Sequence, residues 1–97
     1  MHGYQAKLSV VFFKEGNKFV AYCPPLDLSS CGNTFEQAKN RLTEAVDVFL
    51  QETMKMGTLD SVLRDCGWKK VLRPQKHWVP PVYVGQVQQE VEIPLSK

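Results

Sequence analysis

Apolar and polar residues alternate near the start of the chain, over Ala6–Phe13 (AKLSVVFF). This alternation, with its β-branched and aromatic residues, predicts a strand that buries one face, made of Ala6, Leu8, Val10 and Phe12. Glu15-Gly16-Asn17 predicts a tight turn, because Gly-Asn accepts positive φ angles at little cost. Phe19–Cys23 then predicts the returning strand of an antiparallel hairpin.

Two prolines, Pro24 and Pro25, follow that strand and end it, since neither can donate a hydrogen bond to a sheet. Asp27–Cys31 predicts a short third strand, which turns at Gly32-Asn33. Thr34 is placed to cap a helix, and Gln37 follows at the spacing of a capping box.

The next apolar residues recur at intervals of three and four, which predicts an amphipathic helix over about Phe35–Met54 that packs across the sheet: Phe35, Ala38, Leu42, Ala45, Val46, Phe49, Leu50 and Thr53. If Phe49 faces the core, Phe49→Asp should unfold the protein. Thr58–Cys66 predicts a short second helix closed by Gly67.

The last third of the chain is less regular. Trp68–Arg73 suits a strand or a loop, and the prolines that follow, Pro74, Pro80 and Pro81, exclude a helix between them. Val91–Leu95 alternates as a strand, with Pro94 suited to an edge position or a strand end. We therefore expect one α+β domain over residues 1–97, an antiparallel sheet of three to four strands under one long helix, with residues 68–97 as an irregular tail ending in a strand.

The amino-acid composition restricts the possible functions less than the pattern of apolar and polar residues restricts the fold. The 97 residues suit one small domain, and a net charge of +2 does not by itself indicate a polyanionic partner. The start of the chain lacks the features of a signal peptide, and no apolar run reaches the ~20 residues of a membrane span. Three cysteines without tight spacing do not resemble a secreted disulfide framework, so we expect a cytoplasmic protein without a membrane partner.

The cysteines raise the possibility of a metal site or a nucleophile. A zinc site is favoured by paired ligands such as C-x2-C, whereas Cys23 and Cys31 are separated by a proline turn, and Cys66 and His77 would join them only through folding. A cysteine nucleophile needs a histidine base, for which His2 and His77 are the candidates. Packing of small buried residues explains the cysteines better, so we expect no metal, cofactor or catalytic residue.

The stretch FVAYCPPLDLSSCGNTFEQAKNRLTEAVDVFL, residues 19–50, resembles the core of HicB-type antitoxins. The family pattern is matched here by Tyr22, Pro24, Leu26, Gly32, Thr34, Glu36, Ala38, Asn40, Glu44, Ala45 and Leu50. One departure is Leu26-Asp27-Leu28, where the family often has Leu-Pro-Gly. The resemblance implies a β-β-β-α-β core similar to a truncated ribonuclease H fold.

The same resemblance implies a non-catalytic antitoxin that binds and neutralises a HicA-type mRNA interferase. Partner contacts are expected at Tyr22, Pro24 and Leu26, on a proline-stiffened loop that loses little entropy on binding. Nothing after Gly67 resembles the DNA-binding domain that many members append, so we expect no separate DNA-binding domain. The alternative is a stand-alone relative without a toxin.

Two further functions compete with the antitoxin hypothesis. A ribonuclease H-like enzyme needs converging carboxylates around paired Mg²⁺, but the first strand has none, and Asp27, Glu36 and Asp47 suit a turn, a first helical turn and a solvated helix face. Nucleic-acid binding would use a basic-aromatic segment, residues 64–78, with contacts at Lys69, Lys70, Arg73 and Lys76, and with Trp68 and Trp78 as stacking platforms. A solvated basic segment whose tryptophans cap the core is the favoured interpretation.

Self-association is the last expectation from sequence. The first strand is apolar on both faces, and one helix covers only one of them, which leaves Val11 and Phe13 exposed together with Tyr22. Such a patch, with an unpaired edge strand, predicts a homodimer or a tetramer that uses these three residues. The segment from Trp78 to Leu95 covers the patch in its own chain or reaches a second chain.

Overall fold

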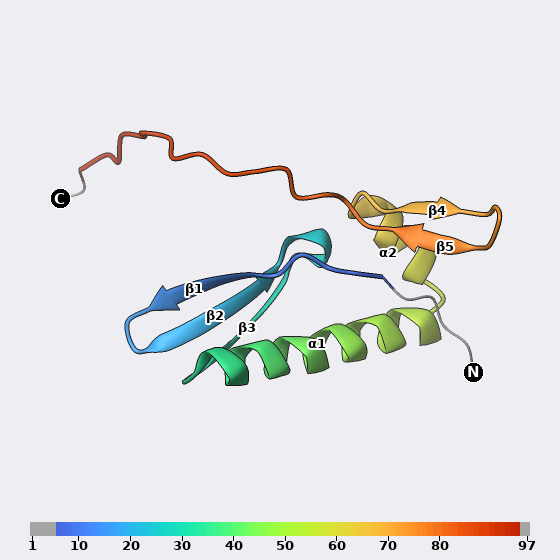
Figure 1. The fold of residues 1–97 in the computed structure, drawn as a ribbon, viewed down its shortest axis with the longest axis horizontal. Coiled ribbons are helices and arrows are strands. Elements are labelled where there is room, and N and C mark those ends of the chain that lie inside the picture. The colour runs from blue at the N-terminus through green and yellow to red at the C-terminus, as the bar shows by residue number, and fades with distance from the viewer. Residues whose placement is uncertain (1–5, 96–97) are drawn as a thin grey trace.

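The computed structural model describes residues 6–95 and confirms the α+β class (Figure 1). A three-stranded antiparallel sheet in the order β1-β2-β3 packs on a long helix, and a short helix and a two-stranded sheet, β4-β5, follow. The elements are β1 (Val11–Glu15), β2 (Lys18–Cys23), a 3-10 turn η1 (Pro24–Leu26), β3 (Leu28–Gly32), α1 (Phe35–Lys55), α2 (Leu59–Asp65), β4 (Lys69–Val71) and β5 (His77–Val79).

The predicted hairpin forms, but its first strand begins at Val11 rather than Ala6. The register pairs Val11 with Tyr22, so residue 10 lies opposite the last residue of β2. Beyond that point the chain turns away through η1, and residues 6–10 have no strand to pair with. Gly16, with a φ of 59°, closes the turn between the two strands as expected.

The predicted cap of the long helix is confirmed. The Thr34 hydroxyl accepts a hydrogen bond from the Gln37 amide at 3.0 Å, while Gln37 Oε1 accepts from the Asn33 amide at 2.7 Å rather than from that of Thr34. A Cβ atom on Gly32 would lie only 2.7 Å from the Ala38 nitrogen. Glycine at this position therefore allows β3 to approach the first turn of α1 closely.

Helix α1 covers one face of the three-stranded sheet, and the hydrophobic core lies between them. The buried residues come from β2, η1, α1, α2 and the segment after α2: Ala21, Cys23, Leu26, Ala38, Leu42, Leu63, Trp68 and Trp78. Phe49 is half-buried against this cluster, as the helix periodicity predicted. Within residues 6–95, no helix combines the length and apolar character that crossing a bilayer requires.

The expected irregular tail is partly regular, because residues 69–71 form one of the strands that Trp68–Arg73 allowed, and its described part does not end in a strand. Residues 69–71 and 77–79 pair as a small sheet. Trp68, just before β4, and Trp78, within β5, are core residues, and Trp68 Nε1 donates a 2.8 Å hydrogen bond to the Pro25 carbonyl. Residues 91–95 form no strand, and the chain over residues 80–95 is extended (Figure 1). Alternation alone does not make a strand, because a strand needs a partner edge for its backbone hydrogen bonds.

Candidate partner-binding surfaces

No helix of residues 6–95 covers the face of the three-stranded sheet opposite α1, hereafter the outer face (Figure 1). Two cross-strand rows form it, Val11–Tyr22–Ser29 and Phe13–Val20–Cys31. Phe13 is 53% exposed, and Val11, Val20 and Tyr22 are half-buried. The residues predicted as an oligomer contact, Val11, Phe13 and Tyr22, are therefore brought together on one surface.

The proline loop adjoins this face. The Tyr22 hydroxyl donates a 2.8 Å hydrogen bond to Asp27 Oδ1, and this bond raises the pKa of Tyr22. Asp27 adopts a left-handed φ of 54°, and its amide donates to the Pro24 carbonyl at 3.2 Å. These bonds connect both ends of the loop, so its conformation is fixed before any partner arrives.

Of the three residues predicted to contact a partner, Tyr22 and Pro24 are accessible and Leu26 is not. Leu26 is 3% exposed and belongs to the core cluster. The expectation that it touches a partner directly is corrected: its apolar side chain supports the loop from below. Sequence did not reveal this because a leucine between a proline and an aspartate suits either orientation.

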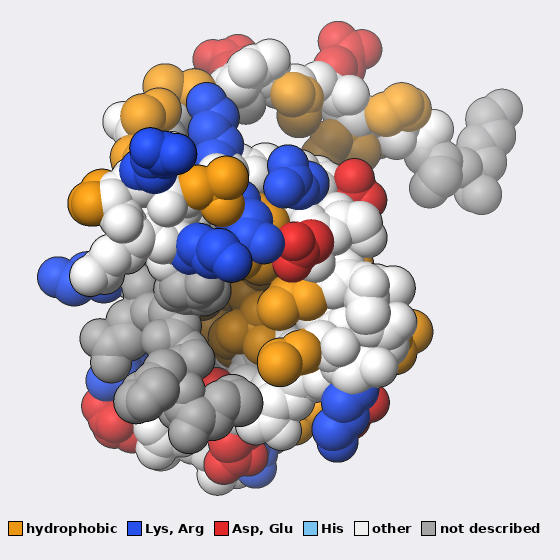
Figure 2. Space-filling view, turned by 90° about the vertical axis from the view of Figure 1, so that its right-hand side faces the viewer, with side chains coloured by type: hydrophobic (Ala, Val, Ile, Leu, Met, Phe, Trp, Pro, Cys, Tyr) orange, Lys and Arg blue, Asp and Glu red, His pale blue; other side chains and the backbone are white. Residues whose placement is uncertain are grey.

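The predicted basic segment gathers on α2 and the β4–β5 hairpin, and Figure 2 shows Lys and Arg side chains clustered at this end of the molecule with acidic ones among them. Lys69, Arg73 and Lys76 are exposed. Lys70 instead forms a 3.0 Å ion pair with Asp60. The positive charge therefore belongs to a surface that is partly neutralised.

The tryptophans of this segment are not stacking platforms. The Arg64 guanidinium and the Lys70 ammonium lie 5.7 Å and 5.5 Å from the Trp78 ring, which is itself 8% exposed. Trp68 is also buried. The interpretation that these rings cap the core is confirmed, and base stacking on them would require the core to open.

The cysteines differ in their surroundings. Cys23 is buried, and this burial raises the pKa of its thiol against a smaller, opposite effect of a backbone hydrogen bond with Leu26. Cys31 is exposed on the outer face and Cys66 is half-buried. Among the described residues, no three His, Cys, Asp or Glu side chains gather as metal ligands would. His2, a candidate base, lies outside the described residues.

The carboxylates considered for a ribonuclease H-like centre lie on different elements. Asp27 follows η1 and is engaged by Tyr22, Glu36 is in the first turn of α1, and Asp47 is in the middle of α1. Each occupies the structural position that the sequence suggested for it.

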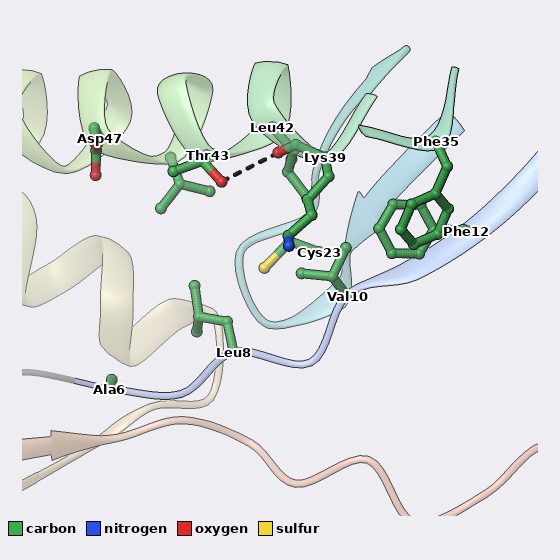
Figure 3. A pocket seen from close by; sticks show the side chains of 11 residues that line it. Ala6, Leu8, Val10, Phe12, Cys23, Phe35, Lys39, Leu42, Thr43 and Asp47 are labelled. Carbon is green, nitrogen blue, oxygen red and sulfur yellow. Dashed lines mark hydrogen bonds between the residues drawn. The ribbon is translucent and has the colours of Figure 1, made fainter. Parts of the chain in front are cut away.

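One feature of the surface was not predicted from sequence. A hollow of about 350 Å³, hereafter the edge groove, opens between the chain before β1 and the side of α1 (Figure 3). One wall is formed by Ala6, Leu8, Val10 and Phe12, and the other by Phe35, Lys39, Leu42, Thr43, Val46 and Asp47. At one end the rings of Phe12 and Phe35 stack with centroids 4.1 Å apart. The sequence feature that could have indicated the groove is the series of apolar residues at even positions from Ala6 to Phe12, which the alternation predicted as a buried strand face.

Comparisons with models of protein families, with curated proteins and with solved structures find no match to this chain. The resemblance to HicB-type antitoxins therefore depends on the residues quoted for it above.

Proposed function

We propose that this protein is a non-catalytic binding protein of the HicB antitoxin type, which neutralises a HicA-type mRNA interferase in the cytoplasm by direct binding. The observation that carries the proposal is the outer face: an apolar sheet surface with no helix over it, adjoining a rigid proline loop. The pattern of residues 19–50 supports the choice of partner class.

The outer face has the properties of a protein-binding surface. Phe13 and Tyr22 are aromatic residues next to aliphatic neighbours, and aromatic side chains of this kind supply most of the energy at interface centres. Tyr22 is held by Asp27, and Pro24 is stiff, so little conformational entropy is lost when they are covered. Polar Ser29 and Cys31 border the apolar residues on β3, as at the margin of an interface.

Nucleic-acid binding through residues 64–78 is the competing function, in a stand-alone relative without a toxin. The exposed charges of Lys69, Arg73 and Lys76 favour phosphate contact. The buried positions of both tryptophans argue against sequence-tolerant stacking on single strands, which depends on free aromatic faces.

The test is co-purification with the protein encoded by the adjacent open reading frame, where we expect a small basic protein. Phe13→Asp should weaken binding by more than about tenfold, since it replaces the most exposed aromatic residue of the outer face with a charge. Asn17→Asp, in the exposed turn of the same hairpin, is the matched control and should bind as wild type.

Unchanged binding of Phe13→Asp would place the partner elsewhere and refute the outer face as the docking surface. A salt-sensitive gel shift that is lost when Lys69, Arg73 and Lys76 are changed to glutamate, without any protein partner, would favour the competing function. Leu26→Ala is unsuitable as a contact test, because truncating a buried leucine costs about 2–5 kcal/mol of stability.

A further inference from the structure

Residues 82–95, hereafter the C-terminal arm, have the sequence of an amphipathic strand but belong to no sheet. Between residues 86 and 93 the even positions are all polar, Gln86, Gln88, Glu90 and Glu92, and the odd ones are apolar except for Gln89. A period of two places these sets on opposite faces of a strand, of which one should be buried. In the structure the apolar set is in solvent: Val91 is 73% and Ile93 80% exposed.

Residues 82–84 of the arm lie beside Pro24 and Pro25 of the body, but the apolar side chains beyond residue 84 are not buried by the same chain. The arm leaves the β4–β5 sheet through Pro80-Pro81 and runs away from the small sheet as an extended chain (Figure 1). The radius of gyration is 16.5 Å. A compact domain of this length would have about 12.5 Å. The arm is thus an unpaired strand with an unburied apolar face.

The body in turn offers a site for such a strand. In the order β1-β2-β3, one edge of β1 is free, and residues 6–10 continue it without a partner. The edge groove opens beside this edge, under the α1 side of the sheet (Figure 3). A strand added here would pair its backbone with β1 and direct every second side chain toward Thr43 and Val46 of α1.

We propose that residues 86–95 of one copy add to the free edge of β1 in a second copy, and that the exchange is reciprocal. Val87, Val91 and Ile93 enter the partner copy's edge groove, and the Gln and Glu face stays in solvent. Pro94, which cannot donate to a ladder, is tolerated on the new edge strand. The proposal goes beyond the antitoxin function and does not depend on it.

Three features favour a second copy as the occupant. Residues 6–15 and residues 86–95 are segments of equal length, about 33 Å each when extended. The accepting segment has exposed Lys7 and Lys14 against one carboxylate, Glu15, and the arm has Glu90 and Glu92, so the net charges of the two segments are complementary. A two-fold exchange fills both grooves and pairs both arms, which closes the assembly.

The exchange moves the expected self-contact from the outer face to the edge of β1. Because the arm pairs at the sheet edge and its apolar side chains enter from the α1 side, the outer face with Phe13 and Tyr22 remains free for a partner protein. Self-association and toxin binding then use different surfaces, so a change that abolishes one should leave the other intact.

Sedimentation at low micromolar concentration should give a species of twice the 11.1 kDa chain mass for the wild type. Val91→Asp with Ile93→Asp should raise the dimer dissociation constant by more than about tenfold. Gln86→Asp with Gln88→Asp, which adds the same two negative charges on the opposite face of the arm, is the matched control and should remain dimeric. Because all four positions are exposed and lie outside the helices, the helical circular dichroism signal should be unchanged in every variant.

Hydrogen exchange distinguishes this arrangement from the others. In the wild-type dimer, every second amide of residues 86–93 donates to β1 and should be protected from exchange. These amides should lose protection in Val91→Asp with Ile93→Asp. A monomeric wild type, whether its arm is protected or not, would overturn the proposal. So would a dimer with an unprotected arm, equal effects of the substitutions on the two faces, or a dimer that Phe13→Asp dissociates and the arm variants do not.

Discussion

Trp68 joins the segment after α2 to the proline loop, and replacing it tests whether residues 68–79 belong to the same cooperative unit as the sheet. Its indole nitrogen donates a 2.8 Å hydrogen bond to the Pro25 carbonyl, a contact between residues 43 positions apart. Trp68 is 7% exposed and Pro25 is buried. Trp68→Phe removes the donor and leaves the carbonyl without its partner.

The expected loss follows from the cost of an unsatisfied buried acceptor, about 1–3 kcal/mol, in addition to the loss of the second ring. Trp78→Phe is the matched control, since Trp78 is also buried. A phenyl ring at this position would keep part of the cation–π interaction with Arg64 and Lys70. The two variants share the same truncation. We therefore expect Trp68→Phe to be less stable than Trp78→Phe by about 2 kcal/mol, or about 8–16 °C in Tm for a domain of this size.

The assay is urea unfolding followed by circular dichroism, with the denaturant slope compared between variants. An unchanged slope with a lower midpoint would indicate one cooperative unit. Equal stability of Trp68→Phe and Trp78→Phe would refute the role of the hydrogen bond. A biphasic transition in the wild type would show that the segment after α2 unfolds separately from the sheet.

Three other outcomes test the core and its surroundings. Gly32→Ala should cost about 1–3 kcal/mol, because the new methyl group meets the Ala38 nitrogen, and faster exchange of the Ala38 amide should report the loosened helix end. Iodoacetamide should modify Cys31 in the native protein and Cys23 only after unfolding. Because burial raises the pKa of the Cys23 thiol, the contribution of this thiol to stability is complete below the ordinary thiol pKa and is lost as the pH rises through the higher folded value. Comparing the alkaline unfolding of the wild type with that of Cys23→Ala would detect this loss. Phe49→Asp should destabilise the protein by about 2 kcal/mol or more in thermal unfolding, and wild-type stability would contradict its place against the core.

Much of the fold could be predicted from the sequence because the residues that determine its turns, strand ends and helix start are close together in the chain. The turn at Gly16, the end of β2 before Pro24 and the start of α1 at Thr34 each depend on residues within a few positions of one another. The buried face of α1 follows from the spacing of its own apolar residues. These interactions are made by neighbours in the chain, so their pattern is visible without a fold.

Only part of the candidate surfaces could be predicted from the sequence. Cross-strand pairing places Val11, Phe13 and Tyr22 on one face, and the hairpin register already implied it. The burial of Leu26, by contrast, depends on α1 and on the segment after α2. No local pattern distinguishes a loop leucine that points inward from one that points outward.

Only the tertiary structure decided which segments far apart in the sequence pair with one another. Trp68 meets Pro25, β4 pairs with β5 across a proline turn, and the edge groove forms where the chain before β1 passes α1. The sequence by itself determined that residues 91–95 alternate as a strand does, and the structure determined that they pair with no other strand of residues 6–95. Alternation specifies which side chains share a face, whereas a strand exists only where another backbone satisfies its hydrogen bonds, and that depends on the whole chain.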